Sequence, residues 1–355
     1  RGAPRAPSGV GWLMSVRRAL LGFWLEIRVI PVLLWSYTAI TLGTAMAWAD
    51  GGGVSVPGYL VAVLMGVLVQ GLVAHCVNEV TDWRSGTDRD PSPRVISGGS
   101  KVIASGLLGP RALVAIAVAA TLAAAALGAA AAVTWGWVLA VYGGLGILGA
   151  ILYTLPPVRA AYRPFTGEAI AFGCAWACVS GAYVLQTGSL TGGVLLAGIA
   201  HAATCVAMLM MHHYLDRVPD SRARPPKTTT IVMLGAAGRR YGVLWAAIAL
   251  AAALLLTALV DGAFAVMAAG AALALVLHAT VAPDDAASVT RNELGVILAG
   301  MLGGLGTAAV LAPGMTWALV PVAALVPLEL ALSGAAHREL MAARSGPAPA
   351  AGERP

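Results

Sequence analysis

Long apolar segments recur along the whole chain, and each is long enough to cross a lipid bilayer as a helix. Hydrophobic residues make up 59% of the 355 residues, and charged residues only 11%. A soluble fold needs far more polar surface than this, whereas a ~30 Å hydrocarbon core requires about 20 apolar residues per helix. The pattern predicts an all-α, polytopic transmembrane helical bundle of nine to ten spans. The candidate spans are residues 30–49, 58–77, 112–133, 136–155, 168–185, 191–215, 241–259, 263–282, 294–312 and 316–333.

Positive charge is restricted to alternate loops of this pattern. With a cytoplasmic amino terminus and ten spans, all 22 Lys and Arg residues fall on the cytoplasmic side. Because Lys and Arg accumulate in cytoplasmic loops, this predicts a multi-pass protein of the inner (plasma) membrane with its polar loops in the cytoplasm. The net charge of +6 then reflects membrane topology, and nucleic acid is not an expected partner.

The chain is predicted to form one membrane domain, residues 21–340. Residues 1–20 form a cytoplasmic lead, and no cleavable signal peptide is expected because the basic start runs into a full-length span. Residues 341–355 are predicted to be a disordered tail. The four cysteines all lie within apolar spans, which indicates small residues in helix interfaces rather than disulfides.

Two acid-rich loops follow the second and sixth predicted spans. The first, NEVTDWRSGTD, places Asn78 and Asp82 four residues apart, with Asp88 beyond a glycine turn. The second, HHYLDRVPDSRARPPKTTT, places Asp216 and Asp220 four residues apart. Residues at this spacing share one face of a helix. Clustered oxygen ligands indicate a hard cation such as Mg²⁺, which completes its shell with water or substrate phosphates.

Basic residues accompany both acidic loops. They are Arg84, Arg89, Arg94 and Lys101 after the first loop, and Arg217, Arg222, Arg224 and Lys227 in the second. Either loop alone is readily explained as a solvated segment that contacts lipid head groups. Together, acids that bind a cation and bases that pair with phosphate oxygens indicate a ligand with a phosphate at one end and a hydrocarbon at the other.

These motifs resemble those of the UbiA superfamily of intramembrane prenyltransferases. Residues 78–88 resemble the first signature, Asn-Asp-x-x-Asp-x-x-x-x-x-Asp, and their Gly-Thr-Asp ending is similar to the MenA branch, the 1,4-dihydroxy-2-naphthoate prenyltransferases. Residues 216–220 resemble the second signature, Asp-x-x-x-Asp, and Lys227 with Thr228 resembles the Gly-Lys-x-Thr that follows it. Residues 153–168 also resemble the MenA pattern between the fourth and fifth spans.

The resemblance implies a central cavity open to the cytoplasmic side, where Mg²⁺ holds an isoprenyl diphosphate. Ionisation would give an allylic cation that an aromatic acceptor captures, which is dihydroxynaphthoate in the MenA branch. The implied metal ligands are Asn78, Glu79, Asp82, Asp88, Asp216 and Asp220. The implied catalytic residues are Asp82, Asp216, Asp220, Lys227 and Tyr153. The implied substrate-binding residues are Arg28, Arg94, Lys101, His213, Arg217, Lys227 and Tyr162.

The chain departs from the family pattern in three features. Glu79 stands where the family usually has Asp, His212 and His213 stand where MenA relatives tend to carry Asn-Asn, and Lys227 comes later than expected. Two alternatives stay open: a UbiA-type terpene cyclase that acts on the prenyl diphosphate alone, and a membrane transporter. Transporters usually place a charged site near the membrane midplane, whereas these acids lie at one face.

Overall fold

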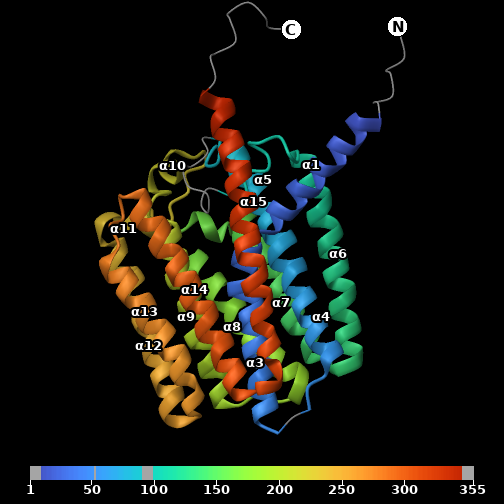
Figure 1. Ribbon diagram of the computed structural model, residues 1–355, viewed down its shortest axis with the longest axis vertical. Helices are drawn as coiled ribbons and strands as arrows, with labels where there is room; N and C mark the ends of the chain where they lie inside the picture. The colour runs from blue at the N-terminus through green and yellow to red at the C-terminus, as the bar shows by residue number, and fades with distance from the viewer. Residues whose placement is uncertain (1–8, 52, 90–98, 346–355) are drawn as a thin grey trace, which may run out of the picture.

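The structure, a computed structural model, describes residues 9–51, 53–89 and 99–345. Helices make up most of these residues, and no β-strand occurs within the described ranges. Long helices run side by side along the long axis of the molecule, and short helices and loops gather at one end (Figure 1). The predicted all-α helical bundle is confirmed.

The helices are named in chain order, with η for short 3₁₀ or π-helical segments. The first half of the chain forms α1 (Gly9–Ile27), α2 (Val29–Val32), η1 (Leu33–Tyr37), α3 (Thr38–Ala49), α4 (Val56–Gly66), η2 (Val67–Ala74), α5 (His75–Ser85), α6 (Pro110–Trp135), α7 (Val138–Thr154) and η3 (Ala160–Tyr162). The second half forms α8 (Thr166–Thr187), α9 (Gly192–His212), α10 (Arg217–Arg222), α11 (Thr230–Leu234), η4 (Gly235–Ala237), α12 (Gly238–Leu259), η5 (Gly262–Phe264), α13 (Ala265–Thr280), α14 (Ala286–Leu311), η6 (Pro313–Leu319) and α15 (Val320–Ser345).

Nine helical stretches in the described part of the chain are long and apolar enough to cross a membrane. The longest, Ser15–Ala49, has 35 residues and joins the end of α1 to α2, η1 and α3. The tenth predicted span, 136–155, is the shorter apolar helix Val138–Thr154. Every predicted span is therefore a helix, and the predicted number of nine to ten spans is confirmed. Helix α15 extends to Ser345, so it includes the first five residues of the predicted tail.

Helix α9 is the most deeply buried of the membrane-spanning helices described. It packs against α8, α12 and α14, and 78% of its most apolar window is buried inside the protein. Its sequence is rich in Gly and Ala, which allow neighbouring helices to approach closely. Helices α3 and α8 also approach closely at a glycine. A Cβ on Gly43 would collide with the carbonyl oxygen of Val179, so this contact has no room for a side chain.

Two π-helical segments lie beside the interior of the bundle. η1 interrupts the first long helical stretch and η2 interrupts the second. The Ser36 hydroxyl in η1 donates a hydrogen bond to the Gln70 amide oxygen in η2, and both residues line the cavity described below. Such π-helical turns are rare in proteins and occur frequently at functional sites.

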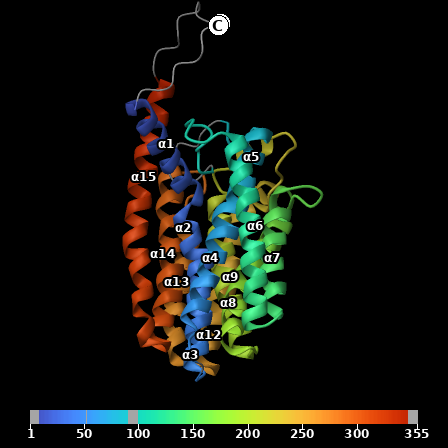
Figure 2. The ribbon, with the colours of Figure 1, turned by 90° about the vertical axis from the view of Figure 1, so that its right-hand side faces the viewer.

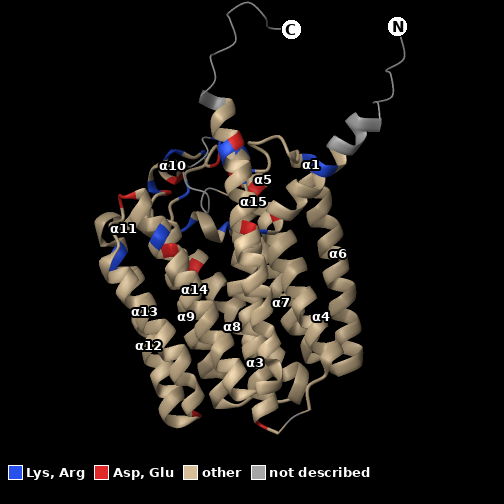
Figure 3. Ribbon diagram, in the orientation of Figure 1, with Lys and Arg blue, Asp and Glu red and all other residues tan. Residues whose placement is uncertain are grey.

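Charged residues of the described chain gather toward one end of the bundle, around α5, α10 and α11 (Figure 3). Lys and Arg occur toward this end, while the opposite end carries acidic positions alone. Helix α15 runs along one edge for the full length of the bundle and finishes at the end where α1 begins (Figure 2). The structure therefore shows the segregation of basic residues that the loop pattern predicts.

Candidate active site

The two acidic motifs lie far apart in the sequence but meet at the charged end of the bundle. Asp82 lies near the end of α5, and Asp220 lies within α10. Helix α5 ends at Ser85, and the left-handed φ of 90° at the following Gly86 lets the chain turn back. The backbone N–H of Arg224 then donates a 2.8 Å hydrogen bond to the carbonyl of Ser85. This contact joins the two motifs directly.

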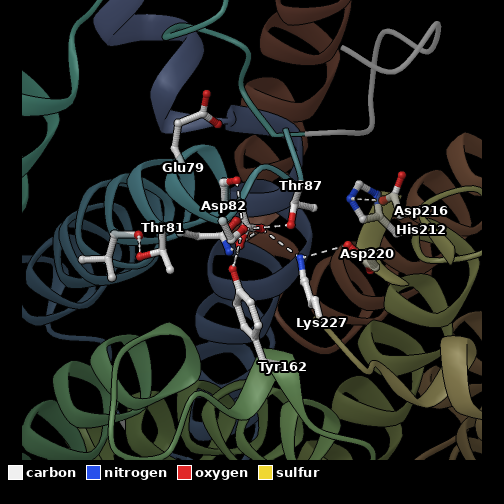
Figure 4. A network of polar contacts seen from close by, with 12 residues as sticks. Glu79, Thr81, Asp82, Thr87, Tyr162, His212, Asp216, Asp220 and Lys227 are labelled. Carbon is white, nitrogen blue, oxygen red and sulfur yellow. Dashed lines mark hydrogen bonds and ion pairs between the residues drawn. The ribbon is translucent and has the colours of Figure 1, made fainter. Parts of the chain in front are cut away.

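Asp82 is the centre of the polar network between the motifs (Figure 4). Its Oδ1 accepts a hydrogen bond from the Tyr162 hydroxyl at 2.6 Å. Its Oδ2 accepts from the Lys227 ammonium at 2.9 Å and from the Asn78 amide at 3.1 Å. The side chain of Asp82 is buried. Three donors from three separate segments therefore fix the orientation of this carboxylate.

Lys227 lies between the carboxylates of the two motifs. Its Nζ is 2.9 Å from Asp82 Oδ2 and 3.6 Å from Asp220 Oδ1. Asp220 is fully buried, and neither carboxylate oxygen has a hydrogen-bond partner among the described residues. Burial raises the pKa of Asp220 to about 8, although the Lys227 charge opposes the rise. Burial disfavours the charge on Lys227, but Asp220 and Asp82 outweigh it and raise the pKa of Lys227 well above its usual range.

Asp88 and Asp216 add a further carboxylate from each motif, and both line the cavity. Burial, followed by repulsion from Asp82 and other carboxylates, raises the pKa of Asp88 well above its usual range. Asp216 Oδ2 lies 3.9 Å from Nε2 of His212, whose Nδ1 is 2.7 Å from Glu293 Oε1. His212 therefore lies between a motif acid and a buried acid of α14.

The oxygen atoms of these side chains fit as ligands of a hard divalent cation. Carboxylate side chains of both motifs and the Asn78 amide line the mouth of the cavity, and Asp220 contributes two buried oxygens that have no hydrogen-bond partner among the described residues. No group of three or more His, Cys, Asp or Glu residues within the described ranges could hold a metal ion by itself. Mg²⁺ does not require such a cage, because one or two carboxylates bind it together with water and substrate phosphates.

Basic side chains line the same mouth. Arg28 and Lys101, both predicted to bind substrate, line the cavity and have left-handed φ angles of 52° and 61°. Burial and then repulsion from Arg28 lower the pKa of Lys101 to about 8, although nearby acids oppose the change. Arg222, named above among the bases of the second loop but not among the implied substrate-binding residues, also lines the cavity. Arg94 lies outside the described residues.

Arg217 and Tyr162, both predicted to bind substrate, do not line the cavity. The Arg217 guanidinium pairs with Asp284 and its Nε donates to the carbonyl of Tyr214, so it turns away from the cavity. Tyr162 is buried and donates its hydroxyl to Asp82, so it orients the carboxylate. Sequence proximity to an acidic motif therefore did not decide which side chains reach the cavity.

His213 and Tyr153 do line the cavity, as expected of substrate-contacting residues. Burial lowers the pKa of His213 well below its usual range, so its imidazole is neutral at physiological pH. Two further acids of the cavity wall had no predicted role: Glu293 of α14 and Glu329 of α15, both buried. An ionisable residue inside a membrane helix is a functional candidate by default, and this rule could have identified both.

The polar mouth leads into a large apolar cavity with a volume of about 820 Å³. Along α7, the lining runs from Tyr153 near the mouth to Leu139, which is about 21 Å at 1.5 Å per residue. The deeper walls include Trp35, Val61, Met65, Val69, Tyr142 and Leu185. A charged mouth above a deep apolar interior suits a ligand with an anionic head and a hydrocarbon tail.

Replacing Lys227 by Met is expected to destabilise the protein, because two buried carboxylates lose the cation between them. Removing one partner of a buried ion pair costs about 3–5 kcal/mol of unfolding free energy. Thermal unfolding in detergent without divalent ions, followed by Trp fluorescence, measures the change. Lys227→Arg keeps the charge and is the control. An unfolding temperature of Lys227→Met equal to that of the wild type would show that this charge does not hold the motifs together.

The fold and the site define an intramembrane enzyme with two facing aspartate motifs above an apolar cavity. The UbiA prenyltransferase family matches residues 36–292, which is most of the chain. The chain belongs to this family, and it is a multi-pass membrane prenyltransferase.

Individual relatives agree with this assignment. The 1,4-dihydroxy-2-naphthoate octaprenyltransferase of Escherichia coli (strain K12) is 27% identical over 221 residues, which cover 61% of this chain and 70% of that protein. Structures of a UbiA homologue from Archaeoglobus fulgidus bound to DMAPP and Mg²⁺, and to GPP and Mg²⁺, match with TM-scores of 0.57 and 0.58. Both cover 81% of this chain and 99% of the homologue at 13% identity, so they show a shared fold.

Proposed function

We propose that this protein is a Mg²⁺-dependent prenyltransferase that moves an isoprenyl group from an allylic diphosphate to an aromatic acceptor. The observation that carries the proposal is the meeting of Asp82 and Asp220, one from each motif, on either side of Lys227 at the mouth of the apolar cavity. Two carboxylates share the single charge of Lys227 and the Asp220 oxygens have no hydrogen-bond partner among the described residues, which suits a further hard cation, and the cavity behind them fits a hydrocarbon tail.

The motif acids would bind the metal and thereby hold the diphosphate at the mouth. When bound, the metal ion would supply positive charge that offsets the charge of a departing pyrophosphate. The acidic and amide residues proposed for this role are Asn78, Asp82, Asp88, Asp216 and Asp220.

Basic residues and the cavity wall complete the proposed reaction site. Lys227, Arg28 and Lys101 would contact the remaining phosphate oxygens. The ring of Tyr153 would stabilise the allylic cation through its π face. The apolar lining excludes water, so the cation reaches the acceptor before it is quenched.

We assign the acceptor to the dihydroxynaphthoate class, which would place the reaction in menaquinone biosynthesis. The support is the Escherichia coli relative, whose name specifies 1,4-dihydroxy-2-naphthoate. The one-sided distribution of Lys and Arg supports a location in the inner (plasma) membrane, with the mouth of the cavity in the cytoplasm.

An assay of the purified protein in detergent tests this function. The protein is incubated with Mg²⁺ and a panel of allylic diphosphates, with and without dihydroxynaphthoate, while pyrophosphate release and organic products are measured. We expect acceptor-dependent release, a prenylated naphthol product and complete loss of activity in EDTA. EDTA followed by excess Mg²⁺ is the control for irreversible damage.

Two outcomes would contradict the proposed function. Pyrophosphate release without an acceptor, together with a cyclic hydrocarbon or alcohol, would identify a terpene cyclase. No Mg²⁺-dependent release with any prenyl chain length, from protein shown to be folded, would exclude both reactions.

A further inference from the structure

The carboxylate of Glu79 is not part of the polar network around Asp82. Figure 4 shows it directed away from Asp82 and Lys227. Its Oε2 accepts a 2.8 Å hydrogen bond from the backbone N–H of Ser100. Glu79 is buried, so this contact with the segment 99–101 is protected from water. The carboxylate at this motif position therefore binds protein backbone, and it lies beside Asp88 but is directed away from Asp82 and Lys227.

A second buried acid holds the same segment. The hydroxyl of Ser100 donates a 2.6 Å hydrogen bond to Glu26 of α1. Ser100 thus connects α1 and α5, because its backbone binds one helix and its side chain binds the other. Glu26 is fully buried.

Both neighbours of Ser100 have left-handed backbone conformations. A Cβ added to Gly99 would lie 2.4 Å from Glu79 Oε2 and 2.8 Å from Asp88 Oδ2, and Gly99 has a left-handed φ of 69°. Lys101 also has a left-handed φ, of 61°, which is unfavourable for a residue with a side chain. Lys101 is nevertheless buried and lines the cavity. The two hydrogen bonds to Ser100 therefore hold the residue that directly precedes this unfavourable backbone conformation.

We propose that Glu79 is a positioning residue for diphosphate binding: it fixes the segment 99–101 so that Lys101 reaches the cavity mouth, and it is not a Mg²⁺ ligand. The inference rests on the proposed function of the site. It also gives a reason for Glu at the position where the quoted family signature has Asp, because the longer side chain reaches the Ser100 backbone. It replaces the metal-ligand role predicted for Glu79 from the family resemblance.

The two roles predict opposite rankings of two substitutions. Glu79→Asp keeps the charge but withdraws the oxygen from Ser100, whereas Glu79→Gln keeps an acceptor oxygen of the same reach and removes the charge. If Glu79 positions Lys101, Glu79→Asp raises the KM for the allylic diphosphate about tenfold and Glu79→Gln stays within about threefold of the wild type. The half-saturating Mg²⁺ concentration then changes less than about twofold in both variants. Asp216→Asn, at a proposed metal ligand, is the positive control for a shift in Mg²⁺ dependence.

A double substitution shows whether the effect passes through Lys101. Lys101→Met should raise the KM by itself, and Glu79→Asp should add little in that background, because both changes remove the same contact. Fully additive effects would contradict the positioning role.

A measurement without catalysis tests the contact between Glu79 and Ser100 directly. Hydrogen exchange of the amides in residues 99–102, in protein free of substrate and metal, should be at least about tenfold faster in Glu79→Asp than in the wild type. Unchanged exchange, or a Glu79→Gln variant whose Mg²⁺ requirement rises about tenfold or more, would overturn the inference. A wild-type protein that releases no pyrophosphate would contradict the proposed function, and the exchange experiment would still decide whether Glu79 fixes this segment.

Discussion

Asp82→Asn is expected to lower the rate of Mg²⁺-dependent pyrophosphate release at least about 10³-fold. The substitution keeps the shape of the side chain but removes the charge that faces Lys227 at 2.9 Å. The two oxygens of Asp82 accept hydrogen bonds from Tyr162 and Asn78, one each. The amide of Asn has only one oxygen, so one of these two bonds loses its acceptor. Single-turnover release at saturating diphosphate, measured across a Mg²⁺ titration, gives both the rate and the change in metal affinity.

The neighbouring residue provides a matched control for Asp82→Asn. The Thr81 hydroxyl donates to the carbonyl of Val77 within its own helix, and Thr81 does not line the cavity. Thr81→Ala should therefore leave the rate within about twofold of the wild type. A rate for folded Asp82→Asn within tenfold of the wild type would refute a central role for this carboxylate.

Gly143→Leu is expected to shorten the longest prenyl diphosphate that the protein accepts. Gly143 lines the cavity along α7, and a Cβ there would lie 3.5 Å from the flexible end of Met65 and 3.9 Å from Gly128. A leucine side chain at this position would project into space that a long tail needs. We expect kcat/KM for geranylgeranyl diphosphate to fall at least about tenfold, and kcat/KM for dimethylallyl diphosphate to change less than about threefold.

The next residue on the same helix separates a blocked cavity from general damage. Gly144 is exposed on the outer surface of α7, and a Cβ there would meet no atom within 4 Å. Gly144→Leu should therefore leave chain-length preference unchanged. Equal losses for short and long diphosphates in Gly143→Leu would indicate that the substitution disturbs the fold rather than the depth of the cavity.

The sequence predicted the membrane-spanning helices and the acidic motifs because both are encoded locally. Every helix must satisfy its own backbone hydrogen bonds in lipid, so each span appears as a continuous apolar run. The spacing between Asn78 and Asp82 likewise follows from one helix, and the structure confirms that their side chains meet on α5. The family motifs also identified Lys227. It comes later after the second motif than the family pattern predicts, but its side chain still contacts Asp82.

Side-chain direction could not be read from the same motifs. Arg217 and Arg222 both belong to the second acidic loop, yet Arg222 lines the cavity and Arg217 pairs with Asp284 outside it. Glu79 stands inside the first motif, but its carboxylate binds Ser100, which lies 21 residues further along the chain. The direction of each side chain depends on which neighbouring segments pack against its helix.

The amino-acid sequence by itself determined that the protein is a helical membrane protein, that its basic residues lie at one side, and which acids lie in the two motifs. Each of these features depends on the length of an apolar run, the sign of a charge or a spacing along one helix, all of which involve only neighbouring residues. Only the tertiary structure decided how these parts meet. Lys227 contacts Asp82 across 145 residues of chain, and Glu293 contacts His212 across 81. These contacts depend on how separate helices pack together, since packing brings buried charges within range of one another and sets the shape of the cavity behind them.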